Sequence, residues 1–149
     1  MGMRLSEQRK VKRAMAEAFS YTADFSNIEN WDPGVARSTK LGDGVVGLGT
    51  RFDLDVKFGS RQIPMVYEIT AYEPPHRVVL VGRGETLDAT DEIRFSQENG
   101  FTVIAYRADL TFRNALRFVI PFLGPVMRKV GKRALDGLAA ALDTTAPDE

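Results

Sequence analysis

Hydrophobic and polar residues alternate along the middle of the chain, and this alternation predicts β-strands. Between residues 50 and 58 every second residue is apolar, from Phe52 to Phe58, and the residues between them are mostly charged. Successive side chains of a strand point to opposite faces, so one face should be buried and the other exposed to water. We expect strands throughout residues 35–112 and one more strand over residues 5–12.

Gly59-Ser60 predicts a two-residue hairpin within this region, because glycine readily adopts the backbone conformation of such turns. The turn pairs Leu54 with Met65 and Phe52 with Tyr67. This register places the apolar side chains of both strands on the same face, as burial of that face requires.

Asn99-Gly100 predicts a second hairpin and is the strongest turn signal in the chain. A two-residue turn here pairs Asp91 with Ala108 on the inner face. The same register sets Glu92 opposite Arg107 on the outer face, where opposite charges across strands are favourable.

Residues 14–25 have a 3.6-residue apolar periodicity that predicts an amphipathic helix. Ser26 and Glu29 form a capping-box pattern, which predicts the start of a second short helix. Asp32-Pro33-Gly34 should end this helix, because proline cannot continue it and glycine accepts a turn.

Apolar residues recur every four positions from Val126 to Leu142 and predict a long amphipathic helix over residues 115–142, followed by a frayed tail over residues 143–149. Basic side chains accumulate around this helix, with no acidic residue between its first and last members. They are Arg113, Arg117, Arg128, Lys129, Lys132 and Arg133. Their simplest interpretation is a water-exposed helix face, and the alternative is a contact with an anionic group or partner protein.

Composition narrows the function classes. The 149 residues fit a single domain with an ordinary share of hydrophobic residues, 44%, and a net charge of zero gives no general attraction to nucleic acid. The absence of cysteine excludes thiolate chemistry, and the lone histidine, His76, excludes a histidine metal cluster. We therefore expect no metal and no cofactor. The charged N-terminus and the lack of a long apolar run favour a cytoplasmic protein without a membrane-spanning segment, bacterial in kind.

Several stretches together resemble a known family. They read YTADFSNIENWDPGV, GLGTRFDL, YEITAYEPPHRVVLVG, DEIRF and VIAYRADLTF. In this order they are similar to the polyketide cyclase/dehydrase branch of the START-like (SRPBCC) superfamily, over residues 5–142. The resemblance implies an α+β helix-grip fold, in which a curved seven-stranded antiparallel sheet wraps around a long C-terminal helix, with two short helices after the first strand and a deep cavity. Members bind hydrophobic small molecules, and some help to cyclise, aromatise or dehydrate polyketide chains.

Three polar residues fall on the predicted inner face: Tyr67, Asp91 and Tyr106. They are the candidate catalytic residues. A tyrosine on this face often serves only as a structural hydrogen-bonding group, whereas a carboxylate among apolar neighbours must be paired, wetted by cavity water or protonated. For Asp91, an ion pair with an arginine such as Arg61, or a position at the cavity edge, stays open as the structural alternative.

Trp31, the only tryptophan, follows the two short helices, where the resemblance places the mouth of the cavity. Its ring suits a cavity wall and its N–H can reach solvent or a ligand, although it could equally pack the short helices onto the sheet. The expected ligand-contacting residues are Trp31, Phe52, Leu54, Met65, Tyr67, Ile93, Tyr106, Phe122 and Val126.

Three functions are consistent with these features. The first is binding of a hydrophobic or amphipathic small molecule, lipid-like or polyketide-like. The second is a polyketide cyclase, aromatase or dehydratase that uses acid–base residues of the cavity. The third is an interaction module that uses the basic C-terminal helix. We expect a small-molecule partner and no nucleic acid, and both a monomer and a homodimer stay open.

Overall fold

The computed structural model describes residues 2–113, 118 and 120–144, and the side chains of residues 120–123 and 144 lie outside this description. The elements in chain order are β1 (Gly2–Val11), α1 (Met15–Ala23), the 3₁₀ turn η1 (Phe25–Asn27), α2 (Ile28–Trp31), β2 (Val35–Leu41), β3 (Arg51–Phe58), β4 (Arg61–Glu73), β5 (Arg77–Gly84), β6 (Leu87–Glu98), β7 (Phe101–Phe112) and α3 (Ile120–Thr144).

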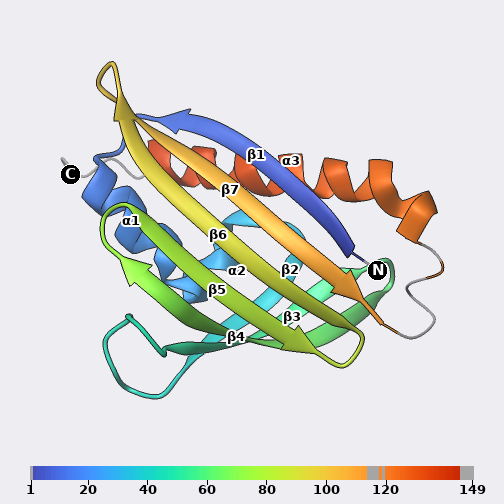
Figure 1. Cartoon of the computed structure of the whole chain (residues 1–149). Coiled ribbons are helices and arrows are strands. Elements are labelled where there is room, and N and C mark those ends of the chain that lie inside the picture. The colour runs from blue at the N-terminus through green and yellow to red at the C-terminus, as the bar shows by residue number, and fades with distance from the viewer. Residues whose placement is uncertain (1, 114–117, 119, 145–149) are drawn as a thin grey trace.

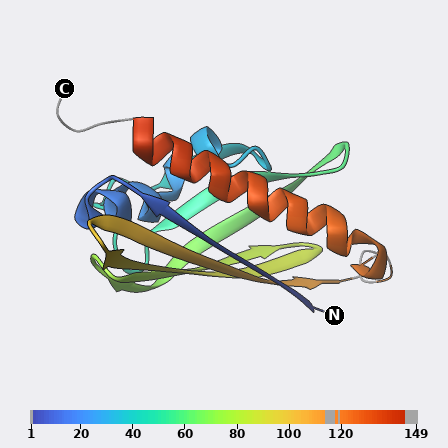
Figure 2. The ribbon, with the colours of Figure 1, turned by 90° about the horizontal axis from the view of Figure 1, so that it is seen from above.

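The seven strands form one antiparallel sheet in the order β1-β7-β6-β5-β4-β3-β2. The sheet twists and curls, and α3 lies along its open side (Figure 1; Figure 2). The helices α1 and α2 follow β1 and cover part of the same side. The predicted helix-grip fold is thereby confirmed, including the two short helical segments after the first strand.

Both predicted hairpin registers are confirmed. Leu54 lies opposite Met65, and Asp91 lies opposite Ala108. The φ angles of Asn99 and Gly100 are 53° and 85°, the left-handed values that a two-residue hairpin turn of this kind needs. Since register decides which face each side chain occupies, the inner face of β6 and β7 is the one that alternation predicted.

The expected capping box at Ser26 is wrong. Asp24 caps the 3₁₀ turn instead, because its Oδ1 accepts hydrogen bonds from the backbone N–H of Ser26 at 3.1 Å and from the Ser26 hydroxyl at 2.6 Å. Glu29 does not reach back to the helix start. Its Oε1 accepts from the backbone N–H of Ser38 at 2.7 Å and ties α2 to β2. A tertiary contact therefore took the side chain that the local pattern assigned to a cap.

Aromatic rings from α1 and η1 fill one end of the concave side. The ring of Phe19 lies 5.3 Å from that of Phe95, and the ring of Phe25 lies 5.4 Å from that of Tyr67. All four residues are buried, so this end of the sheet is a packed core without a void.

Gly82 of β5 lies directly beneath the ring of Tyr67, its neighbour on β4. A Cβ atom on Gly82 would come within 2.5 Å of that ring. The irregular pairing of β4 with β5 lies further along, between Ile69 and Ala71. Gly82 is thus needed for the close approach of Tyr67 and does not mark a bend in the sheet.

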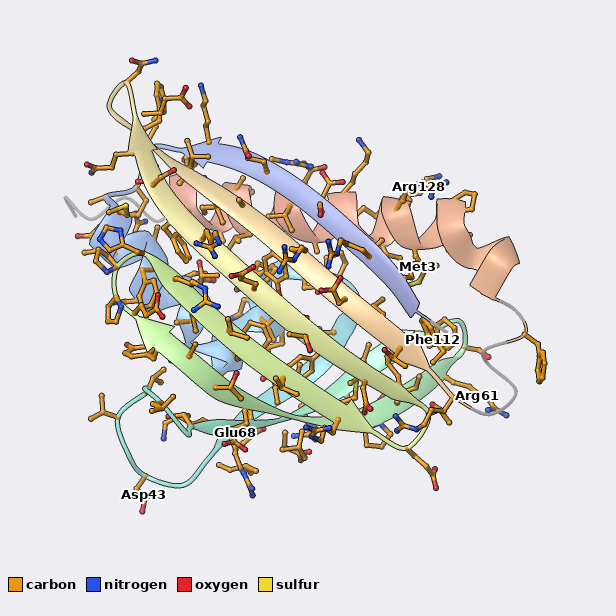
Figure 3. All side chains as sticks on the ribbon, in the orientation of Figure 1. Met3, Asp43, Arg61, Glu68, Phe112 and Arg128 are labelled. Atoms are coloured by element: carbon orange, nitrogen blue, oxygen red, sulfur yellow. The ribbon has the colours of Figure 1, made fainter. Side chains whose placement is uncertain are left out.

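The helix α3 begins at Ile120, whereas the periodicity placed its start at residue 115. Its basic residues Arg128, Lys129, Lys132 and Arg133 are all exposed, and Figure 3 shows Arg128 at the outside of the molecule. None of the helices in the described part of the chain has the length and apolarity needed to cross a bilayer.

Candidate ligand cavity

A cavity lies between the concave side of the sheet and the facing side of α3. It has two adjoining compartments of about 370 and 140 Å³. The larger volume falls in the range of small-molecule sites, about 300–1,000 Å³. The residues that line both compartments are Asp32, Val56, Tyr67, Leu87, Asp91, Tyr106, Met127 and Val130.

The larger compartment reaches the surface beside the hairpin of β3 and β4. Its outer residues Lys57, Gly59 and Val126 are exposed, and its walls include apolar side chains such as Phe58 and Phe112. Phe112 is visible at the end of β7 in Figure 3. An apolar molecule therefore has a route from solvent along apolar walls.

The smaller compartment is the inner one. Trp31, at the end of α2, lines it together with Ala134 and Leu135 of α3, and these three residues are almost completely buried. The Trp31 ring meets the Tyr106 ring edge-on with centroids 6.2 Å apart. The indole N–H is buried without a hydrogen-bond partner among the described residues. The expectation that this N–H reaches solvent is wrong, because α3 covers it.

Asp91 and Tyr106 form the polar centre of the cavity. The Tyr106 hydroxyl donates a hydrogen bond of 2.5 Å to Oδ2 of Asp91, and Asp91 is only 6% exposed. Burial raises the pKa of Asp91 to about 7; the Tyr106 hydrogen bond lowers it, and the nearby negative charge of Asp32 raises it. The alternative ion pair with Arg61 is wrong, because that residue lies at the β3–β4 turn, opposite Phe58.

Asp32 is the functional candidate that the sequence analysis missed. It lies directly after Trp31, and its Oδ1 accepts a hydrogen bond of 2.8 Å from the backbone N–H of Gly34. Burial raises its pKa to about 6, against lowering by that hydrogen bond and by the charge of Lys57. The Asp-Pro-Gly sequence explained Asp32 fully as a turn residue, so no local signal pointed to a cavity position.

Tyr67 is the third polar residue of this group. It is 7% exposed and lines both compartments, yet its hydroxyl makes no hydrogen bond within the described part of the chain. Burial raises its pKa well above the usual tyrosine value, and the charges of Asp91 and Asp32 raise it further. We call Asp32, Tyr67, Asp91 and Tyr106 the polar cluster.

The sequence profile described as "Polyketide cyclase / dehydrase and lipid transport" matches residues 3–143. The chain belongs to this family. No functionally curated protein matches it. Within the polyketide cyclase/dehydrase and lipid transport family, the cavity described above is the place where sheet and helix leave room for a ligand.

Solved structures share the fold at low sequence identity. The Zhui aromatase/cyclase from Streptomyces sp. R1128 is similar with a TM-score of 0.77 at 11% identity, over 95% of this chain and 94% of that one. A protein from Thermus thermophilus, TTHA0849, gives 0.80 at 11%, over 94% and 97%. A START superfamily protein from Mycobacterium smegmatis gives 0.71 at 16%, over 95% of both chains.

The structure divides the nine expected ligand-contacting residues of this family member into three groups. Those that line the cavity are Trp31, Leu54, Tyr67, Tyr106 and Val126. Phe52, Met65 and Ile93 are at most 1% exposed and line neither compartment. The side chain of Phe122 lies outside the described part of the structure.

Phe52 shows why an inner-face residue can miss the cavity. It lies on the predicted face of β3, but its ring is 6.1 Å from that of Phe25 in η1. The concave face is shared between packed core under α1 and η1 and open cavity under α3.

Proposed function

We propose that this protein binds a hydrophobic or amphipathic small molecule in the cavity between the sheet and α3. The single observation that carries the proposal is a pocket of about 370 Å³ with apolar walls, open to the surface at one end and bearing a small polar cluster at the other. Apolar walls bind a ligand by removing its surface from water, and a few fixed polar groups orient it. The family description, which includes lipid transport, supports the same function.

Filling the cavity tests the proposal. Ala108 of β7 lines the inner compartment, and Ala105 of the same strand lies on the opposite face. We expect Ala108→Phe to weaken binding of the neutral fluorescent probe Nile red strongly, and Ala105→Phe to leave it nearly unchanged. Equal binding by both variants, each confirmed as folded by circular dichroism, would contradict the proposal. Native mass spectrometry of freshly purified protein would show any ligand that it carries.

A second candidate function is acid–base catalysis on a polyketide-like substrate. It is supported by Asp91, whose pKa of about 7 lets the carboxyl group both give and take a proton near neutral pH. The hydrogen bond from Tyr106 would hold this carboxyl in one orientation toward the cavity. Turnover of a cyclisable poly-β-ketone by the wild type, with loss of turnover in Asp91→Asn, is the expected result. Unchanged turnover in the variant would exclude Asp91 as the acid–base group.

A further inference from the structure

The charge pattern of the cavity is one-sided. The ionisable side chains that line it are Glu7 of β1, Asp32 after α2, Lys57 of β3, Tyr67 of β4, Asp91 of β6 and Tyr106 of β7. The lining residues of α3 in the described part are uncharged. Lys57 is exposed at the outer end, and Glu7 pairs with Arg9 at 3.0 Å. Asp91 and Asp32 therefore have no cation beside them in a salt bridge among the described residues.

Carboxylates without a cation are costly in an apolar cavity, because burial removes the water that stabilises their charge. A ligand that brings a positive charge would supply the missing partner. A ligand that brings a carboxylate of its own would place a third negative charge beside these two. Head-group charge is thus the property that this cavity discriminates most strongly.

Two further features favour a cation over a neutral head group. The buried Tyr67 hydroxyl, 7% exposed, lines both compartments without a hydrogen-bond partner among the described residues, so its oxygen is free to accept a hydrogen bond from a ligand. The rings of Trp31, Tyr67 and Tyr106 line the inner compartment beside the two carboxyl groups. Aromatic faces attract ammonium groups through cation–π interactions, which are worth about 2 kcal/mol when the cation is desolvated.

We propose that the ligand is an amphipathic amine, whose ammonium group lies between Asp32 and Asp91 and whose hydrocarbon part runs outward along the larger compartment. This inference rests on the proposed function and names the class of ligand. The outer walls suit the hydrocarbon part, because Leu54, Phe58 and Phe112 supply apolar surface there. The raised pKa values of Asp91 and Asp32 agree with carboxyl groups that lack a cation.

The test compares three ligands that differ only in head group. Decylamine, decan-1-ol and decanoate compete with Nile red for the wild-type protein at about pH 8, where both aspartates are mainly ionised. We expect decylamine to bind at least about tenfold more tightly than decan-1-ol, since a hydrogen bond to a charged group contributes more than a neutral one, and decanoate to bind most weakly. Lowering the solution to about pH 5 protonates both aspartates and should weaken decylamine at least about tenfold, with little change for decan-1-ol.

Variants locate the effect. Asp91→Asn and Asp32→Asn should each reduce the preference for decylamine over decan-1-ol by about tenfold. The matched control is Asp53→Asn, which removes one negative charge from the outer face, where Asp53 pairs with Arg37 at 3.0 Å. It should leave the preference unchanged.

Each outcome decides something. Tighter binding of decan-1-ol or decanoate than of decylamine to the wild type would overturn the amine proposal and leave the proposed function standing. So would a decylamine preference that survives in both cavity variants. Failure of Nile red and all three ligands to bind would overturn the proposed function itself, and the amine proposal with it. The wild-type ranking needs no variant, so it holds even if a substitution prevents folding.

Discussion

The carboxyl group of Asp91 is held in an environment that disfavours its charge. It is surrounded by buried strand residues, and its one hydrogen-bond donor in the described structure is the Tyr106 hydroxyl at 2.5 Å. In the folded protein its pKa is about 7, whereas an aspartate in an unfolded chain titrates near 3.8. The folded state therefore holds a proton that the unfolded state has already lost between these two values.

This difference predicts how stability depends on pH. As the pH rises from about 4 to about 8, the Asp91 contribution to folding becomes unfavourable by on the order of 4 kcal/mol, because the carboxylate ionises only at a cost in the folded protein. We expect Asp91→Asn to raise the thermal midpoint at about pH 8 by several degrees and to change it little at about pH 4. Thermal unfolding by circular dichroism across this range measures both. A less stable variant at about pH 8 would mean that a cation does pair with Asp91.

Trp31 predicts a second result at the same scale. It is the only tryptophan, it lines the inner compartment, and it contacts Tyr106, which is hydrogen-bonded to Asp91. A ligand that enters this compartment changes the polarity beside the indole ring. We expect its fluorescence emission to shift or to be quenched on addition of a long-chain ligand. An unchanged spectrum at saturation, with binding established by Nile red displacement, would assign Trp31 to packing alone.

At the scale of elements, the crossing of α2 and α3 closes the inner end of the cavity. Gly137 of α3 lies so close to α2 that a Cβ atom there would collide with the backbone carbonyl of Trp31. Backbone on both sides of this contact leaves no flexible side chain that could move away. The position of Trp31 in the cavity wall thus depends on a glycine of another helix.

A pair of substitutions on the same helix tests this crossing. Gly137→Ala should lower the free energy of unfolding by about 2 kcal/mol or more, because the two helices must separate to admit the methyl group. Gly131→Ala is the control. Its Cβ atom would have only ordinary contacts, the nearest with Leu5 at 3.9 Å, so the higher helix propensity of alanine should stabilise the protein by up to about 1 kcal/mol. Chemical denaturation measures both values, and equal effects would show that the crossing tolerates a wider separation.

At the scale of the whole molecule, sheet and helix enclose an unfilled volume that a packed core of this size would not contain. A ligand that fills it binds only the folded state and stabilises that state by mass action. At a free ligand concentration of about 100 times the Kd, the gain is about 2.7 kcal/mol. We expect the thermal midpoint of the wild type to rise with ligand concentration, and that of Ala108→Phe to rise much less. A midpoint independent of ligand would place binding elsewhere or exclude it.

The strands and their pairing could be predicted from the sequence because they depend on local chemistry. Alternation decides which side chains share a face, and Asn99-Gly100 allows only a narrow set of turns, so the pairing of Asp91 with Ala108 followed from adjacent residues. The opposition of Glu92 and Arg107 followed in the same way, and the two side chains form a 2.8 Å ion pair. The long apolar periodicity of α3 likewise identified the helix, although not its first turn.

The composition of the cavity wall was decided by tertiary structure. Alternation places Phe52 and Leu54 on the same inner face, but only the positions of η1 and α3 determine that Phe52 is packed and Leu54 lines a cavity. Asp32 joins Asp91 because α2 ends beneath α3, far along the chain from β6. A local pattern describes a residue's own backbone and its near neighbours, and Asp32 was already explained by the turn that it makes. Bringing two carboxyl groups into one apolar cavity is a property of the closed fold, and no stretch of this sequence contains it.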